Sequence, residues 1–161
     1  MKKMLYQQLT DYVLEKLPDS YRQNLYSWME NGKLINEGGN VTQTGIVIAH
    51  IEYDSVLFFE NLPFRKINPY KILAMIQIWL NENEYLRNVM DEYITPFDIE
   101  VIDENSAEFS LTIKFREPIT AELDSNGDLE IDGERYRLDE IEINEASEFY
   151  LTMKVETCNQ D

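Results

Sequence analysis

The stretch that decides the fold is NPYKILAMIQIWLNENE, residues 68–84. Asn68 is a residue type that caps helices, and Pro69 suits the first helical position because its missing N–H needs no partner there. From Tyr70 to Leu80 only Lys71 and Gln77 are polar, and at about 100° per residue they lie roughly 120° apart. The sequence therefore predicts a helix without a single polar side, packed on more than one side.

Two arrangements would cover such a helix. It could lie centrally, between a sheet and the N-terminal helices, or it could be buried at an interface with a second copy of the chain. The sequence leaves both arrangements open. The side chains predicted to make these core or subunit contacts are Tyr70, Leu73, Met75, Ile76, Trp79 and Leu80.

Upstream of this helix, apolar residues recur at helical spacing in two segments. The spacing predicts one helix over residues 2–16, a break at Pro18, and a second helix over 21–29 that ends at Asn31-Gly32. Residues 31–45 contain three further glycines and are predicted to form a mobile loop that orders on binding a partner. Its candidate contact residues are Lys33, Asn36, Gly38, Gly39 and Asn40.

The remaining segments predict strands. IVIAHIEY, residues 46–53, is β-branched and apolar, and 56–59 either pairs with it as a hairpin or continues one bent strand. After Pro96, apolar and polar residues alternate, as is typical of antiparallel strands with one face in water. The predicted strands are 97–101, 109–115, 119–123, 129–131, 136–138 and 149–155, with hairpin turns at Asn126-Gly127 and Asp132-Gly133.

The chain has 161 residues, 43% hydrophobic, which suits one globular domain spanning residues 1–161. The order of helices, strand, helix and strands predicts an α+β fold. In it, a mostly antiparallel sheet packs against the N-terminal helices and one central apolar helix.

The formal charge is −17, which disfavours a broad basic surface for nucleic acid. Residues 117–148 hold twelve acidic and two basic residues, a net −10, and form either a solvated outer face or a surface that repels an anion or docks a basic partner. The segment DSNGDLEIDGE is not a calcium loop, because the sixth and twelfth places counted from Asp124 hold Leu129 and Arg135 instead of glycine and glutamate.

Residues able to carry catalysis are sparse. His50, the single histidine, lies within an apolar strand and is predicted to be structural, and Cys158, the single cysteine, lies in a polar tail. We therefore predict no catalytic, cofactor-binding or metal-binding residues, and no enzyme. The N-terminus lacks a signal-peptide pattern, and the longest apolar stretch, 72–80, is too short for a membrane span, so we expect assembly in the cytosol.

The order of several motifs along the chain gives information beyond composition and periodicity. NLYSWMENGKLI, IVIAHIEYDS, NPYKILAMIQIWLNENE and FSLTIKFRE leading into DGERY follow one another over residues 5–154. In this the sequence resembles the phage tail completion protein R family of temperate contractile-tailed phages. The very acidic segment 117–148 and the short ending ETCNQD depart from familiar members.

The resemblance implies a tail-terminator-like domain that caps the head-proximal end of the tail and prepares it for joining to the head, without catalysis. It implies a ring of copies, commonly hexameric, with tail tube, sheath and head–tail connector proteins as partners. The expected location is the bacterial host cytoplasm during assembly, and then the virion tail. Alternatives are a neck protein on the head side, or an inhibitor whose acidic face imitates nucleic acid.

A ring also suggests a role for the acidic segment. Part of it would border the opening, where like charge keeps DNA from adhering, or would contact a partner. The candidate acids are Asp124, Asp128, Glu130, Asp132 and Glu134.

Overall fold

A computed structural model describes residues 2–41, 45–83 and 94–142. Its elements are, in chain order, β1 (Lys2–Lys3), α1 (Leu5–Lys16), the 3₁₀ turn η1 (Arg22–Asn24), β2 (Leu25–Ile35), β3 (Gly45–Leu62), α2 (Pro69–Asn83), β4 (Phe97–Val101), β5 (Ala107–Leu123), β6 (Leu129–Ile131), β7 (Glu134–Leu138) and β8 (Ile141–Glu142). The predicted strand 149–155 lies outside the described residues.

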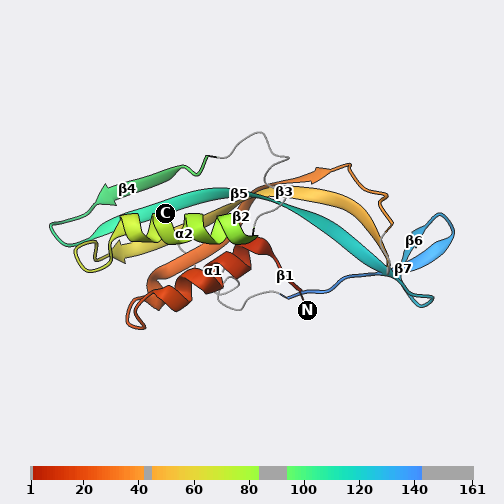
Figure 1. Cartoon of the computed structure of the whole chain (residues 1–161), viewed down its shortest axis with the longest axis horizontal. Coiled ribbons are helices and arrows are strands. Elements are labelled where there is room, and N and C mark those ends of the chain that lie inside the picture. The colour runs from red at the N-terminus through yellow and green to blue at the C-terminus, as the bar shows by residue number, and fades with distance from the viewer. Residues whose placement is uncertain (1, 42–44, 84–93, 143–161) are drawn as a thin grey trace, which may run out of the picture.

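The main sheet is antiparallel and is built around two long strands (Figure 1). β3 and β5 pair along almost their whole length, and β2 adds to the outer edge of β3. The outer edge of β5 is shared, because β4 pairs with its residues 107–111 and β7 with its residues 121–123. β6 then completes a hairpin with β7. This hairpin projects from one end of the molecule (Figure 1).

Strict alternation along β5 builds the core. Its odd-numbered residues from Ala107 to Phe115 are at most 1% exposed, whereas the polar residues between them are half-buried. Leu57 and Phe59 of β3 lie opposite Leu111 and Phe109 and are also fully buried. The predicted alternation is therefore confirmed here, since one face of the sheet carries the core and the other carries Glu108, Ser110, Thr112 and Lys114.

The two helices lie beside each other on the core face, over the half of the sheet away from the hairpin (Figure 1). α1 inserts Leu9 and Val13, and α2 inserts Ile72 and Ile76. The prediction of one central helix between the sheet and the N-terminal helices is therefore wrong, because α2 neighbours α1 in the same layer. The outer side of α2 is exposed in the single chain.

The predicted second N-terminal helix is also wrong, because Leu25 begins strand β2. Leu25 and Ser27 point to the helices, where Ser27 accepts a hydrogen bond from Thr10 at 2.7 Å, while Trp28 takes the other face and is also buried. A strand that is covered on both faces shows no alternation, so its apolar residues imitate helical spacing. Asn31-Gly32 is no helix stop; Asn31 has a positive φ of 53° at a register shift in β2.

Residues 45–62 form one bent strand, so the hairpin alternative does not hold. Residues 119–123 likewise belong to the long β5, not to a separate strand. Asn68 caps α2 as expected, since its side-chain oxygen accepts the N–H of Tyr70 at 2.9 Å. The mixed fold with a mainly antiparallel sheet and segregated helices is confirmed.

Candidate functional site

The projecting hairpin of β6 and β7, with the turn that leads into it, forms an arm over residues 123–138. Asp132 and Gly133 both have positive φ, 51° and 82°, as the tight hairpin turn requires. At the base of the arm, Gly127 donates its N–H to the Asp124 carbonyl at 2.9 Å, which forms the other predicted turn. A side chain at Gly127 would overlap the carbonyl oxygen of Tyr136. The hairpin predicted at Asp132-Gly133 is confirmed. The chain also turns at Asn126-Gly127, but the hairpin predicted there is wrong, because β7 lies between β5 and β6 in the sheet.

Four of the predicted acids, Asp128, Glu130, Asp132 and Glu134, are exposed on this arm. The two cations of the arm contact groups within the arm or at its base. Arg137 pairs with Glu122 at 2.9 Å and with Asp124 at 3.4 Å, and Arg135 donates to a backbone carbonyl. Asp124 is therefore partly neutralised, and the other four carboxylates give the arm a negative surface.

The arm is also amphipathic. Cross-strand register places Leu123 and Leu129 opposite Tyr136, so these side chains share a face with Leu138 and Ile131, and with Glu134 opposite Ile131. Leu123 is 58% exposed and Leu138 is 44% exposed, so no described part of the chain covers this face fully. The same face continues into a hollow of about 520 Å³ that Val41 and Ile46 also line, together with Asp132 and Glu134.

A second uncovered apolar surface lies at the opposite end of the molecule, on β4. Phe97 and Ile99 pair with core residues Leu111 and Phe109, and the rings of Phe97 and Phe109 meet edge-on with centroids 6.2 Å apart. The odd-numbered side chains of β4 therefore continue the core face of the sheet beyond the reach of α2. Every residue of β4 is exposed.

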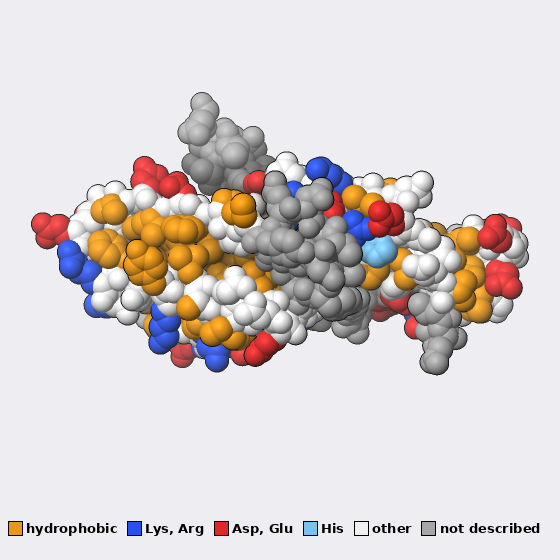
Figure 2. Space-filling model, turned by 45° about the horizontal axis from the view of Figure 1, so that its top comes forward, with side chains coloured by type: hydrophobic (Ala, Val, Ile, Leu, Met, Phe, Trp, Pro, Cys, Tyr) orange, Lys and Arg blue, Asp and Glu red, His pale blue; other side chains and the backbone are white. Residues whose placement is uncertain are grey.

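We call this surface the β4 patch. Its members are Phe97, Ile99 and Val101 on the strand, Ile94 before it, and Tyr70 on α2, with exposed fractions between 39% and 78%. Figure 2 shows apolar side chains gathered over this end of the molecule. Single exposed apolar residues are ordinary on soluble proteins, but a contiguous group marks a contact surface.

Cations border the β4 patch. Arg65 and Lys66 lie in the connection between β3 and α2, and Lys71 lies on the first turn of α2; all three are exposed. Arg65 donates from Nε to the carbonyl of Glu104 at 2.6 Å, which ties this connection to the turn between β4 and β5. Asp98 and Glu100 alternate with the apolar residues of β4 and therefore belong to the other face of the strand.

The predicted contact helix is divided between core and surface. Ile76, Trp79 and Leu80 are buried in the core, and Leu73 and Met75 are half-buried against it. Tyr70 alone of the six predicted residues is strongly exposed, at 78%.

The predicted partner-contact loop is fastened to the sheet. Lys33 belongs to β2, Gly39 donates to the Val47 carbonyl at 2.7 Å, and Asn40 accepts the Val47 N–H at 3.0 Å. Glu37 forms an ion pair with the buried Arg116, which also pairs with Glu52 at 3.2 Å. A side chain at Gly38 would overlap the backbone of Ile48. Asn36 lies in the same exposed segment, whose partner-contact role stays a prediction.

His50 has a structural contact of the kind predicted, because its Nδ1 lies 2.6 Å from the carbonyl oxygen of Glu37.

Sequence reasoning missed a buried polar cluster at the start of α1. Glu117 of β5 accepts the N–H of Leu5 at 3.0 Å and the hydroxyl hydrogen of Tyr53, while Tyr6 donates its N–H to the Tyr53 oxygen at 3.3 Å. Burial, and then the Glu117 carboxylate, raise the pKa of Tyr53 above its usual value. Glu117 thus acts as a remote cap of α1, and nothing in its local sequence distinguishes it from the surrounding acids.

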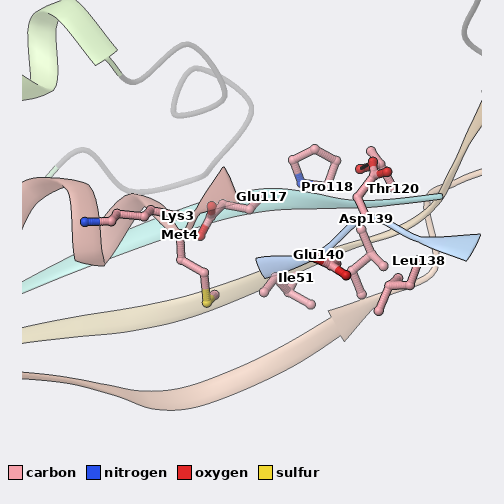
Figure 3. A pocket seen from close by; sticks show the side chains of 10 residues that line it. Lys3, Met4, Ile51, Glu117, Pro118, Thr120, Leu138, Asp139 and Glu140 are labelled. Carbon is pink, nitrogen blue, oxygen red and sulfur yellow. Dashed lines mark hydrogen bonds between the residues drawn. The ribbon is translucent and has the colours of Figure 1, made fainter. Parts of the chain in front are cut away.

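A pocket of about 200 Å³ lies next to this cluster, between the chain start and the base of the arm (Figure 3). Lys3, Met4 and Glu117 line one end of it, and Leu138, Asp139 and Glu140 line the other. Its volume is below the roughly 300 Å³ at which small-molecule sites begin. Its polar groups are also partly engaged, since Thr120 donates to Asp139. The pocket therefore offers little for a ligand.

Within residues 2–41, 45–83 and 94–142, no group of three or more histidine, cysteine or carboxylate residues is placed to hold a metal ion. Across the same residues, no helix is long and apolar enough to cross a membrane. The described residues present an acidic arm at one end, and an apolar patch bordered by cations at the other.

Comparison with known proteins gives two matches. Residues 1–140 match the family described as P2 phage tail completion protein R. The chain is also 52% identical over 156 residues to the uncharacterized 19.2 kDa protein in the rep-hol intergenic region of Haemophilus phage HP1 (strain HP1c1), an alignment that covers 97% of this chain and 94% of the relative. No solved structure matches the chain.

Proposed function

Because the chain belongs to the P2 phage tail completion protein R family, we propose that its copies form a ring that caps the head-proximal end of a finished tail. Membership makes it a tail completion protein and places it in the tail of the virion. The ring would prepare that end of the tail for joining to the head. Its role would be structural, without catalysis.

The observation that carries this proposal is the β4 patch. The five side chains of the patch expose roughly 550 Å² of apolar surface, if a fully exposed large side chain is taken as about 180 Å². One partner in a standard protein interface contributes about 800 Å². This area lies near the upper end of the roughly 300–600 Å² of the largest apolar patch on a typical monomeric protein, and such patches are often contact sites. Assembly with further copies would cover it.

A ring requires a heterologous contact, in which one surface meets a different surface on the next copy until the rotation closes. The chain offers two different surfaces, at its two ends. We propose a ring of six copies, with tail tube and sheath proteins on one side and head–tail connector proteins on the other. Assembly would take place in the cytoplasm of the bacterial host.

Electron microscopy of tails made with and without the protein tests this proposal. Tails made without it should be overlong or end in bare, unjoined tubes, and supplying the chain should restore joined virions. Tails of normal length that join heads without the protein would overturn the proposal. Labelled protein found on unjoined heads, and absent from unjoined tails, would assign it to the head side of the neck instead.

A further inference from the structure

We infer that the arm of one copy docks on the β4 patch of the next copy. The inference deepens the proposed function, on which it rests, by naming the two surfaces that meet in the ring. The occupant of the β4 patch is therefore a second copy of this chain, and the contacting segment is residues 123–138.

The positions of the two surfaces make the contact intermolecular. The arm projects from one end of the molecule, whereas β4 and the start of α2 lie at the other end (Figure 1). The arm of a copy therefore cannot reach its own β4 patch. A contact between opposite ends is heterologous, as ring closure requires.

Charge complementarity favours this pairing. Arg65, Lys66 and Lys71 border the β4 patch, and the turn beside them carries two carboxylates, Asp103 and Glu104. The arm presents Asp128, Glu130, Asp132 and Glu134, and its own arginines are held by Glu122, Asp124 and a backbone carbonyl. On a chain of charge −17, two arms would repel each other, so the border of the β4 patch is the favourable destination for an arm.

Apolar complementarity supplies the centre of the contact. The uncovered face of the arm presents Leu123 and Leu138, and it borders the hollow that Val41 and Ile46 line. Phe97, Ile99 and Val101 would pack against this face and the apolar side of the hollow, beside Asp132 and Glu134. An apolar centre with a charged rim is the usual anatomy of a protein interface.

The arm also makes few packing contacts within its own copy. β6 and β7 are three and five residues long, and Tyr136 is the one large side chain of the arm that is buried. β7 joins the main sheet through three residue pairs with β5, and the hairpin beyond them has little packing of its own. Docking on a neighbour would supply that packing.

A charge swap tests the pairing in the full-length chain. The double variant Lys66→Glu with Lys71→Glu, and separately Asp128→Lys with Asp132→Lys, should each weaken self-association in sedimentation velocity about tenfold or more. All four changes together should restore it to near the wild-type value. The charge control is Lys16→Glu, at an exposed position outside both surfaces. Val101→Asp, within the β4 patch, should weaken self-association, whereas its control Leu34→Asp, at an exposed position outside both surfaces, should leave it unchanged. All variants should keep the wild-type melting temperature of the single chain.

Zero-length crosslinking of amines to carboxylates gives an independent measurement, both in solution and on purified tails. Mass spectrometry of mixed light and heavy copies should find Lys66 or Lys71 linked to acids of the arm between copies. Absence of such links on both samples, or self-association that neither reversal alters, would overturn the docking. If the charge-reversed variants of the arm keep the oligomer intact but block DNA passage, the acids belong to the opening of the ring. This result would also overturn the docking.

The tail result is separable from these outcomes. If the protein completes tails but shows no crosslinks between arm and β4 patch, the proposed function stands and the proposed docking is refuted. A chain that is absent from tails loses the proposed function, whatever its association in solution.

Discussion

Replacing Glu117 should destabilise the fold far more than replacing any exposed acid. Glu117→Ala removes the acceptor of the Leu5 N–H and of the Tyr53 hydroxyl, both at or near the core. Each donor left without a partner costs about 1–3 kcal/mol, with the lower end for Leu5, which is half-buried. Loss of the negative charge at the start of α1 adds about 0.3–1 kcal/mol. We expect a total of about 3 kcal/mol.

Urea unfolding of the single chain measures this cost. Glu117→Gln keeps one acceptor oxygen but loses the charge, so it should cost about 1–2 kcal/mol. The matched control is Glu15→Ala, an exposed acid on α1, which should stay within about 0.5 kcal/mol of wild type. A double-mutant cycle of Glu117→Ala with Tyr53→Phe should give a coupling of about 1–2 kcal/mol. If Glu117→Ala behaves like Glu15→Ala, the remote cap does not stabilise the fold and the reasoning fails.

Three further predictions concern the arm, the ion pair and pH. Gly127→Ala should displace the arm because the new methyl group meets the Tyr136 carbonyl; faster amide exchange confined to residues 123–138 supports this, and unchanged exchange contradicts it. Arg116→Met should release Glu37 and cost about 1–3 kcal/mol, with proteolysis appearing in residues 36–41; a resistant segment would show that the ion pair does not hold it. The stability of the fold should fall as pH rises above about 10, because the folded state raises the pKa of Tyr53 and so favours its protonated form. Tyr53→Phe should decline less steeply over that range, and a parallel decline would exclude this group as a cause.

Local chemistry made parts of the fold predictable from the sequence. Asn68 and Pro69 define the start of α2 by capping and by the missing N–H, and alternation defines β4 and most of β5. Asp132-Gly133 specifies a tight turn because both residues tolerate positive φ. In each case the signal lies within a few residues of the element it determines.

The parts that could not be predicted depend on distant contacts. β2 was taken for a helix because Leu25 and Trp28 are buried on opposite faces by different neighbours. Glu117 was indistinguishable from solvated acids until the fold brought it to the start of α1. The exposure of β4 depends on how far the helix layer extends over the sheet, a distance that no local pattern encodes.

The register shift in β3 between Val47 and Ala49 gives a last geometric consequence. It interrupts the long ladder with β5 between the half of the sheet backed by helices and the base of the arm, so it influences the angle at which the arm leaves the body. In a closed circle built by arms, that angle fixes the curvature per copy and hence the stoichiometry. Deleting one residue at the shift would then alter the circumference of the collar, together with the lining of the hollow, to which Val47 and Ile48 belong.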